Sequence, residues 1–191
     1  MPATGALFGE VNEFARDTPW LHGPAVAFAN YGIVVFGLLL VLGWWIARGQ
    51  SARVMAAALT APLSTLVAVA INQPIVAHVA ESRPYVAHPH MLLLVTASAD
   101  PSFPSDHATM AGAVAAALWL VSWRLGLTAS ILAVAMAATR VYVGAHYPQD
   151  VIAGLALGVA VALVVWLIAR IPMTRLVEWM RQTRLAPILQ G

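Results

Sequence analysis

The chain has 191 residues, of which 61% are hydrophobic and only 9% are charged, with ten basic residues against eight acidic ones. A soluble globular domain carries about 25% charged residues, so the composition and the mean hydropathy of +0.80 exclude an ordinary water-soluble enzyme and a disordered chain. The basic residues form no stripe, which excludes a nucleic-acid-binding domain. The length fits one domain over residues 1–191, and we predict an integral membrane protein with an all-α fold.

Residues 1–20 are predicted to form a short amphipathic helix that lies at a membrane surface. Leu7, Phe8, Val11 and Phe14 share one helical face, and most of the charged residues lie opposite. Periodicity alone also fits a frayed, soluble tail, so both alternatives stay open.

Five apolar segments follow, each close to the roughly 20 residues that cross a bilayer. The run from 108 to 139 holds a single charge, Arg124. As one helix this run would be about 48 Å long, so we divide it there. The predicted spans are residues 24–47, 54–79, 106–123, 125–143 and 150–169. In the last span, Gly154 and Gly158 either allow close helix packing or pair by chance. Residues 174–184 are predicted to form a second interfacial helix, whose arginine face suits anionic lipid.

The distribution of arginine predicts the orientation of the spans. All ten basic residues are Arg, and with the N-terminus outside, seven fall in cytoplasmic segments: Arg48, Arg53, Arg124, Arg170, Arg175, Arg181 and Arg184. Seven of the eight acidic residues then fall outside, and only Glu178 does not. We therefore expect a multi-pass protein of the cell membrane with its N-terminus outside.

Three polar clusters are predicted to meet on the outer side. The first follows span two at residues 81–85, the second opens span three at residues 103–107, and the third runs from Thr139 and Arg140 to His146 and Asp150. Ionisable residues at membrane depth are costly and usually functional. Their convergence at one membrane face therefore predicts a site.

The residue types in these clusters suit phosphoryl transfer without a metal. Arg83 and Arg140 offer bidentate donors for phosphate oxygens, and Ser105 lies at a helix N-terminus, where it can cap the helix and where free N–H groups bind anions. His146 lies four residues before a carboxylate that can hold its Nδ1–H and direct Nε2 at a substrate. A second imidazole, His107, can give a proton to the leaving group. This set of groups predicts a phosphohistidine intermediate.

Other roles stay open for several of these residues. A lone Arg near a helix end is more often a snorkelling anchor than a ligand, and Asp150 also fits a first-turn residue favoured by the helix dipole. Two His and one Asp also suit zinc, although two nearby Arg side chains oppose a cation. His88 and His90 stay unassigned in the outer loop. We expect no metal and no cofactor.

At these residues the sequence resembles the type-2 phosphatidic acid phosphatase superfamily of membrane lipid phosphatases. The signature of that family is Lys, six residues and Arg-Pro; then Pro-Ser-Gly-His; then Ser-Arg, five residues, His, three residues and Asp. The matching positions here are Arg83-Pro84, Pro104-Ser105-Asp106-His107, Thr139-Arg140, His146 and Asp150. The resemblance runs from span two through span five.

Residues 100–109 and 11–15 look like the bacitracin-resistance subgroup of undecaprenyl-diphosphate phosphatases. This resemblance implies an outward-facing site that removes the terminal phosphate of a polyprenyl diphosphate, in support of the recycling of the cell-wall lipid carrier. It implies a nucleophile, an orienting carboxylate and an acid at His146, Asp150 and His107. It also implies that the phosphate is bound by Arg83, Ser105 and Arg140.

Two positions depart from the family signature. Val76 stands where the signature has Lys, and the chain has no Lys elsewhere. Asp106 replaces Gly and puts a carboxylate beside the anion site, either as a first-turn residue or as a group that shares a proton with phosphate or with His107. Two rival functions remain: a phosphatase of a glycerolipid phosphate, such as phosphatidylglycerol phosphate or phosphatidic acid, and a non-catalytic carrier of lipid phosphates. The sequence indicates no oligomeric state.

Overall fold

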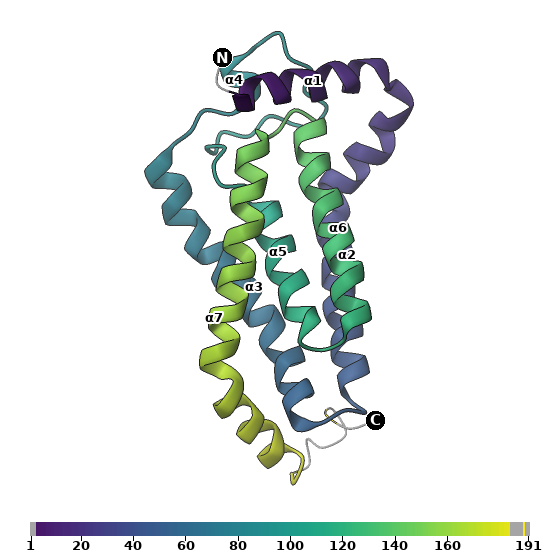
Figure 1. Ribbon diagram of the computed structural model, residues 1–191, viewed down its shortest axis with the longest axis vertical. Helices are drawn as coiled ribbons and strands as arrows, with labels where there is room; N and C mark the ends of the chain where they lie inside the picture. The colour runs from purple at the N-terminus through teal and green to yellow at the C-terminus, as the bar shows by residue number, and fades with distance from the viewer. Residues whose placement is uncertain (1–2, 184–188, 190–191) are drawn as a thin grey trace.

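The chain forms a bundle of long helices with one further helix lying across its end (Figure 1). The computed structural model describes residues 3–183 and residue 189, and this part of the chain contains helices and no strand. The α-helices are α1 (Ala3–Asp17), α2 (His22–Ala47), α3 (Ala52–Val79), α4 (Pro84–Ala87), α5 (Asp106–Trp119), α6 (Trp123–Tyr142) and α7 (Pro148–Met180), and a 3-10 turn covers Pro19–Leu21. The predicted all-α fold is confirmed.

Within the described residues, four helical segments are long and apolar enough to cross a membrane: Pro19–Ala47, Ala52–Ala87, Trp123–Tyr142 and Pro148–Met180. The third predicted span, 106–123, is too long, because α5 ends at Trp119 after 14 residues. A helix of this length covers about 21 Å, against a hydrocarbon core of about 30 Å. The segment before α5 enters the bundle to meet it, since Ser102, Pro104 and Ser105 are buried.

The central helix of the bundle is α5, which packs against α3, α6 and α7 and is buried at every residue from Ala108 to Leu118. Its close approach to α7 depends on glycine. A Cβ at Gly154 would lie 2.6 Å from the carbonyl oxygen of Ser105, and a Cβ at Gly158 would overlap that of Thr109. The glycine pair therefore serves close helix packing, and the alternative of a chance pair is wrong.

Helix α1 lies across the end of the bundle at which α5 and α7 begin (Figure 1). Phe8 is 1% exposed, and its ring centre lies 5.3 Å from that of Tyr147. The Asn12 amide exchanges two hydrogen bonds of 2.9 and 3.0 Å with the backbone of Leu92. The alternative of a frayed tail is therefore wrong for residues 3–17. The predicted apolar face is only partly buried, because Phe14 and its neighbour on that face, Leu7, remain exposed.

The end of α7 corrects the prediction of a separate interfacial helix at 174–184. Helix α7 continues through Pro172 to Met180, although proline lacks an N–H and disfavours a helix interior. The last turns are held by tertiary contact, because Val177 is 0% exposed and belongs to one apolar cluster with Ala47 and Met55. Residue 184 of the predicted helix lies outside the described residues.

Candidate active site

The three polar clusters meet around a cavity of about 400 Å³ at the end of the bundle that α1 crosses. Its walls come from the end of α3, the segment after it, the first turn of α5, the last turn of α6 and the α6–α7 loop. The predicted site residues that line this cavity are Arg83, Asp106, His107, Arg140 and His146. Ser105 and Asp150 are 0% exposed and lie outside the lining, and His88 and His90 do not contribute to it.

A larger groove of about 680 Å³ lies between α1, α2, α6 and α7. Its walls are apolar side chains such as Phe14, Phe28 and Ile152, with no arginine or histidine among them. The described lining of this groove has no charged side chain and no imidazole, so the smaller polar cavity is the candidate active site.

The hydrogen bonds of His146 fix the tautomer of its imidazole. The side chain is 3% exposed in the loop between α6 and α7. Nδ1 lies 2.9 Å from the carbonyl oxygen of Ser102, which only accepts, so Nδ1 carries the proton. Nε2 lies 3.3 Å from Nη1 of Arg83, which only donates, so Nε2 keeps its lone pair. The basic nitrogen of His146 therefore faces the cavity and an arginine.

Asp150 supports this imidazole less directly than the sequence predicts. Its Oδ2 lies 3.5 Å from Nδ1 of His146, farther than the carbonyl oxygen of Ser102. The same Oδ2 accepts from the Ser102 hydroxyl at 2.5 Å and from the backbone N–H of Tyr147 at 2.8 Å. Ser102 is 0% exposed and bridges the two side chains. Its carbonyl oxygen accepts from the imidazole of His146, and its hydroxyl donates to the carboxylate of Asp150. Sequence reasoning missed this residue, because a backbone acceptor carries no signal in residue type.

The surroundings of His146 favour its neutral form. Burial lowers the pKa of His146 below the ordinary imidazole value, and the positive charges of Arg140 and Arg83 lower it further, while Asp150 opposes them. A nitrogen nucleophile must be unprotonated to attack. The surroundings of His146 therefore favour the unprotonated form that a nitrogen nucleophile would need.

Two arginines bring positive charge to the cavity in different ways. Arg83 is held by the backbone, since its Nε donates to the carbonyl oxygen of Asp100 at 2.7 Å and its Nη1 to that of Ala145 at 3.2 Å. Arg140 is 8% exposed, and its Nε has no hydrogen-bond partner within the described residues. An orphaned guanidinium donor at a buried site is costly, and a phosphate oxygen is a ligand that would satisfy it.

The first turn of α5 carries two further predicted site residues. His107 lines the cavity beside Arg140 and His146. Ser105 is the N-cap residue of α5, but the prediction that its hydroxyl caps the helix is wrong, because that side chain makes no cap bond. Its Oγ is buried with no partner in the described part of the chain. Among the residues that the structure describes, the side chains of His107 and Ser105 thus have no hydrogen-bond partner, one in the cavity and one beside it.

The structure gives Asp106 a set of partners. Its Oδ1 accepts from Nδ2 of Asn72 at 2.7 Å and from Nε2 of Gln73 at 2.9 Å. Asn72 also donates to the carbonyl oxygen of Pro104 at 3.1 Å. Asp106 therefore ties the first turn of α5 to α3, and two amides share its negative charge. The two amides were visible in the sequence as a polar interruption of an apolar run, without an assigned partner.

Two other features shape the cavity. Val76, which stands at the position of the signature lysine, lines the wall and is 7% exposed. Glu81 holds the segment behind the imidazole, because its carbonyl oxygen accepts from the N–H of Ser102 at 2.8 Å and its carboxylate accepts from Gln149 at 2.8 Å.

Among the described residues, no group of three or more His, Asp or Glu side chains is arranged to hold a metal ion.

A helical membrane bundle with an oriented imidazole and two arginines around one cavity defines a class of enzymes that act on phosphate groups. The sequence profile of the PAP2 superfamily matches residues 57–172. The chain therefore belongs to the PAP2 superfamily, and it is a membrane lipid phosphatase.

Named relatives agree with this family. The undecaprenyl-diphosphatase BcrC of Bacillus subtilis (strain 168) is 30% identical over 155 residues, which cover 81% of this chain and 78% of BcrC. YbjG of Escherichia coli (strain K12), which is named as a proposed undecaprenyl-diphosphatase, is 32% identical over 193 residues, covering 97% of this chain and 94% of YbjG. The crystal structure of Aquifex aeolicus LpxE matches the fold with a TM-score of 0.68 and 23% identity, over 84% of this chain and 92% of LpxE.

Proposed function

We propose that this chain removes the terminal phosphate of a polyprenyl diphosphate, undecaprenyl diphosphate or a similar lipid, and so supports the recycling of a cell-wall lipid carrier. The observation that carries the proposal is the imidazole of His146, whose Nδ1–H is held by Ser102 while its Nε2 lone pair faces a cavity with two arginines. The substrate is supported by the name of BcrC, an undecaprenyl-diphosphatase that covers most of the chain.

The proposed reaction has two displacement steps. In the first, Nε2 of His146 attacks the terminal phosphorus, the bond from that phosphorus to the bridging oxygen breaks, and His107 gives its proton to the lipid phosphate that leaves. In the second, water gives a proton to His107 while its oxygen attacks the phosphohistidine, and the N–P bond breaks to release inorganic phosphate. Arg83, Ser105 and Arg140 bind the phosphate oxygens and stabilise the charge that develops.

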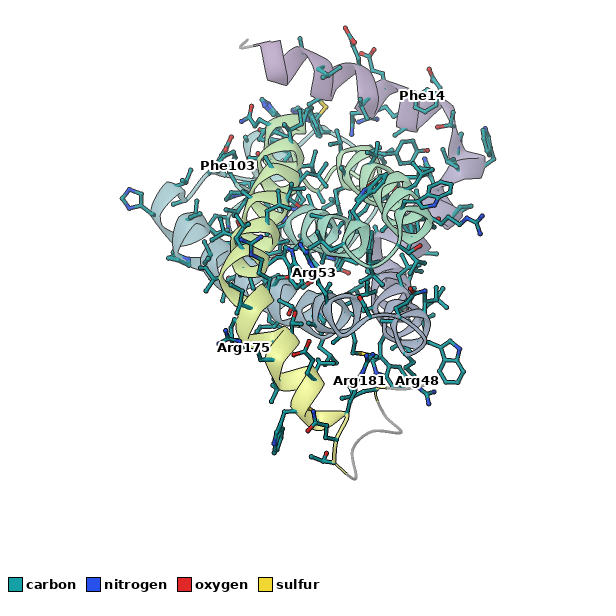
Figure 2. All side chains as sticks on the ribbon, turned by 60° about the horizontal axis from the view of Figure 1, so that its bottom comes forward. Phe14, Arg48, Arg53, Phe103, Arg175 and Arg181 are labelled. Atoms are coloured by element: carbon teal, nitrogen blue, oxygen red, sulfur yellow. The ribbon has the colours of Figure 1, made fainter. Side chains whose placement is uncertain are left out.

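The proposed site faces the outer leaflet. The end of the bundle opposite α1 carries Arg48, Arg53, Arg175 and Arg181, which Figure 2 labels where that end comes forward. Arginine-rich ends of spans face the cytoplasm. The cavity at the other end then opens to the extracytoplasmic side.

The test is a search for the covalent intermediate. His146→Ala should abolish phosphate release from undecaprenyl diphosphate and leave no acid-labile phosphate on the protein after rapid quenching. His107→Ala should slow formation of that label, because the leaving group lacks its proton donor. His78→Ala is the matched control, since His78 is an exposed histidine of α3 outside the cavity. Most of the wild-type rate in His146→Ala would contradict the mechanism.

A panel of lipids separates the proposed substrate from its rivals. Faster hydrolysis of phosphatidylglycerol phosphate or phosphatidic acid than of undecaprenyl diphosphate would assign the chain to glycerolipids. Saturable binding of these lipids with no phosphate release from any of them would indicate a lipid-phosphate carrier instead.

A further inference from the structure

A second charged cavity, of about 370 Å³, lies at the end of the bundle opposite the candidate active site. It is formed by the first turn of α3 and by the α7 segment that follows the predicted last span. Its lining consists of Arg53, Arg170, Ile171, Thr174, Arg175 and Glu178. Figure 2 labels Arg53 and Arg175, one from each wall, at the end of the bundle that comes forward. The cavity shares no residue with the phosphatase site.

The arginines of this cavity differ from other arginines at the same end. Arg124 stacks on the ring of Trp123 with its guanidinium carbon 5.5 Å from the ring centre, and Arg181 donates to the carbonyl oxygen of Gln50 at 2.9 Å. In contrast, the guanidinium groups of Arg53, Arg170 and Arg175 form no hydrogen bond, ion pair or ring contact within residues 3–183 and 189. The described residues thus leave three guanidinium groups around one cavity without an acceptor.

Glu178 does not neutralise this cluster. It is the one carboxylate in the lining, and within the described residues it lies in no ion pair with any of the three arginines. Arg53 also stands in the first turn of α3, where the helix dipole disfavours a cation and favours an anion. Three arginines against one carboxylate, beside a helix N-terminus, form a cavity that is suited to an anion with several oxygens.

The surface around the cavity indicates where this anion comes from. Leu167, Ile168 and Ile171 on α7 are 59%, 73% and 55% exposed, and Trp179 beyond them is 60% exposed. The apolar stretch marks the depth of lipid chains, and tryptophan favours the membrane interface. Arg170 and Arg175 lie between Ile168 and Trp179 along α7, at the level of lipid head groups. We propose that Arg53, Arg170 and Arg175 bind the phosphate of an anionic membrane lipid in the leaflet opposite the active site.

Native mass spectrometry of the detergent-solubilised full chain, titrated with phosphatidylglycerol, tests this site. The double variant Arg53→Gln/Arg175→Gln should bind about 25-fold more weakly, because each Arg near an anionic lipid contributes about 1 kcal/mol, or about fivefold. Glu178→Gln should bind more tightly, since it removes the opposing charge. Arg175→Lys should not restore full binding, because an ammonium lacks the bidentate fork.

Matched controls separate a built site from general attraction. Arg124→Gln removes a positive charge from the same end of the bundle outside the cavity, and it should leave binding unchanged. Phosphatidylcholine should bind weakly to every variant. Circular dichroism should show unchanged helical content in the arginine variants, because Arg53, Arg170 and Arg175 are exposed. If one of these variants does not fold, Arg170→Gln is tested in its place.

Three outcomes would overturn the proposal. If Arg124→Gln weakens phosphatidylglycerol binding as much per charge removed as Arg53→Gln/Arg175→Gln does, the lipid is held by general electrostatic attraction rather than by a site. Displacement of phosphatidylglycerol by an equal concentration of inorganic phosphate would show a site for a free anion. Unchanged binding in a folded Arg53→Gln/Arg175→Gln variant would show that the arginines take no part.

Discussion

Ser102 is expected to set the pH at which the phosphatase loses activity in acid. Its hydroxyl lies 2.5 Å from Oδ2 of Asp150 and competes with the imidazole of His146, whose Nδ1 lies 3.5 Å from the same oxygen. Ser102→Ala removes the hydroxyl and leaves the backbone carbonyl in place. The carboxylate then loses its shortest donor, and Nδ1–H becomes its best remaining partner.

The size of the effect follows from the two distances. At an effective dielectric constant of about 20, shortening an ion pair from 3.5 Å to about 2.8 Å strengthens it by about 1.2 kcal/mol. That free energy corresponds to about 0.9 pH unit. A stronger pair favours imidazolium, so the pKa of His146 should rise. Because the neutral imidazole is the proposed nucleophile, activity should be lost at a pH about 0.9 unit higher than in the wild type.

The assay is the pH profile of kcat/KM, whose acidic limb reports the base of the free enzyme. The charged groups that face His146 are Arg83, Arg140 and Asp150. Arginine is charged at any acidic pH, so a shift of the acidic limb in Ser102→Ala reports the pairing of His146 with Asp150. Thr109→Ala is the control. It removes another buried hydroxyl nearby, whose one hydrogen bond among the described residues is to the carbonyl oxygen of Ser105 at 3.0 Å, and it should leave the acidic limb at the same pH.

A purely structural role for Ser102 would give a different result. Activity would then fall by the same factor at every pH, as expected for Thr109→Ala, with an unchanged midpoint of the acidic limb. A limb that moves to lower pH would show that the Ser102 hydroxyl strengthens the pairing of His146 with Asp150 instead of competing with it. Either result would refute the reasoning.

Three other predictions test the cavity and its placement. Val76→Lys should fold and should lower KM for lipid monophosphates about tenfold or more, because a charge-assisted hydrogen bond contributes about 1.5–3 kcal/mol; unchanged steady-state kinetics would show that the side chain does not reach the phosphate. Activity should survive strong chelators and should be inhibited by vanadate, whose adducts resemble the in-line transition state; loss on chelation with recovery on adding zinc would indicate a metal enzyme. The chain has no cysteine of its own, and residues 86 (60% exposed) and 182 are both exposed. Val86→Cys should therefore react with membrane-impermeant reagents from outside and Gln182→Cys from inside, and the reverse pattern would contradict an outer-leaflet site.

The sequence predicted the long helices because charges are so sparse that uncharged runs mark them directly. It also predicted that residues from three segments would meet, and Arg83, His107, Arg140 and His146 line one cavity. Motif spacing was enough for this result, because each motif stands at a helix end, and successive long helices run in opposite directions, so that these ends meet at one end of the bundle. The roles of these residues stay predictions until the intermediate and the variants have been measured.

The details that the sequence did not give depend on tertiary contact or on the backbone. Helix α7 continues beyond Pro172 because Val177 is buried against other helices, and local sequence alone favours a break at proline. The acceptor for the His146 Nδ1–H is a carbonyl oxygen of Ser102, and every residue type offers such a group. The carboxylate of Asp106 accepts hydrogen bonds from the side-chain amides of Asn72 and Gln73 on α3. Whether these amides point toward Asp106 depends on how α3 and α5 pack, which the local sequence does not show.

The cavity has no formal net charge in its described lining when its histidines are neutral, because Arg83 and Arg140 are balanced by Asp100 and Asp106. The carboxylate of Asp106 accepts hydrogen bonds from two side-chain amides, and that of Asp100 accepts one from the hydroxyl of Ser98 at 2.9 Å. Neither carboxylate therefore needs an arginine as its partner. A phosphate that enters adds negative charge, which favours the protonated form of a nearby imidazole. His146 resists protonation because it is buried and because the positive charges of Arg140 and Arg83 lower its pKa further. Under the proposed mechanism, phosphate binding favours the charged form of His107, which lines the same cavity and is the acid that the first step consumes.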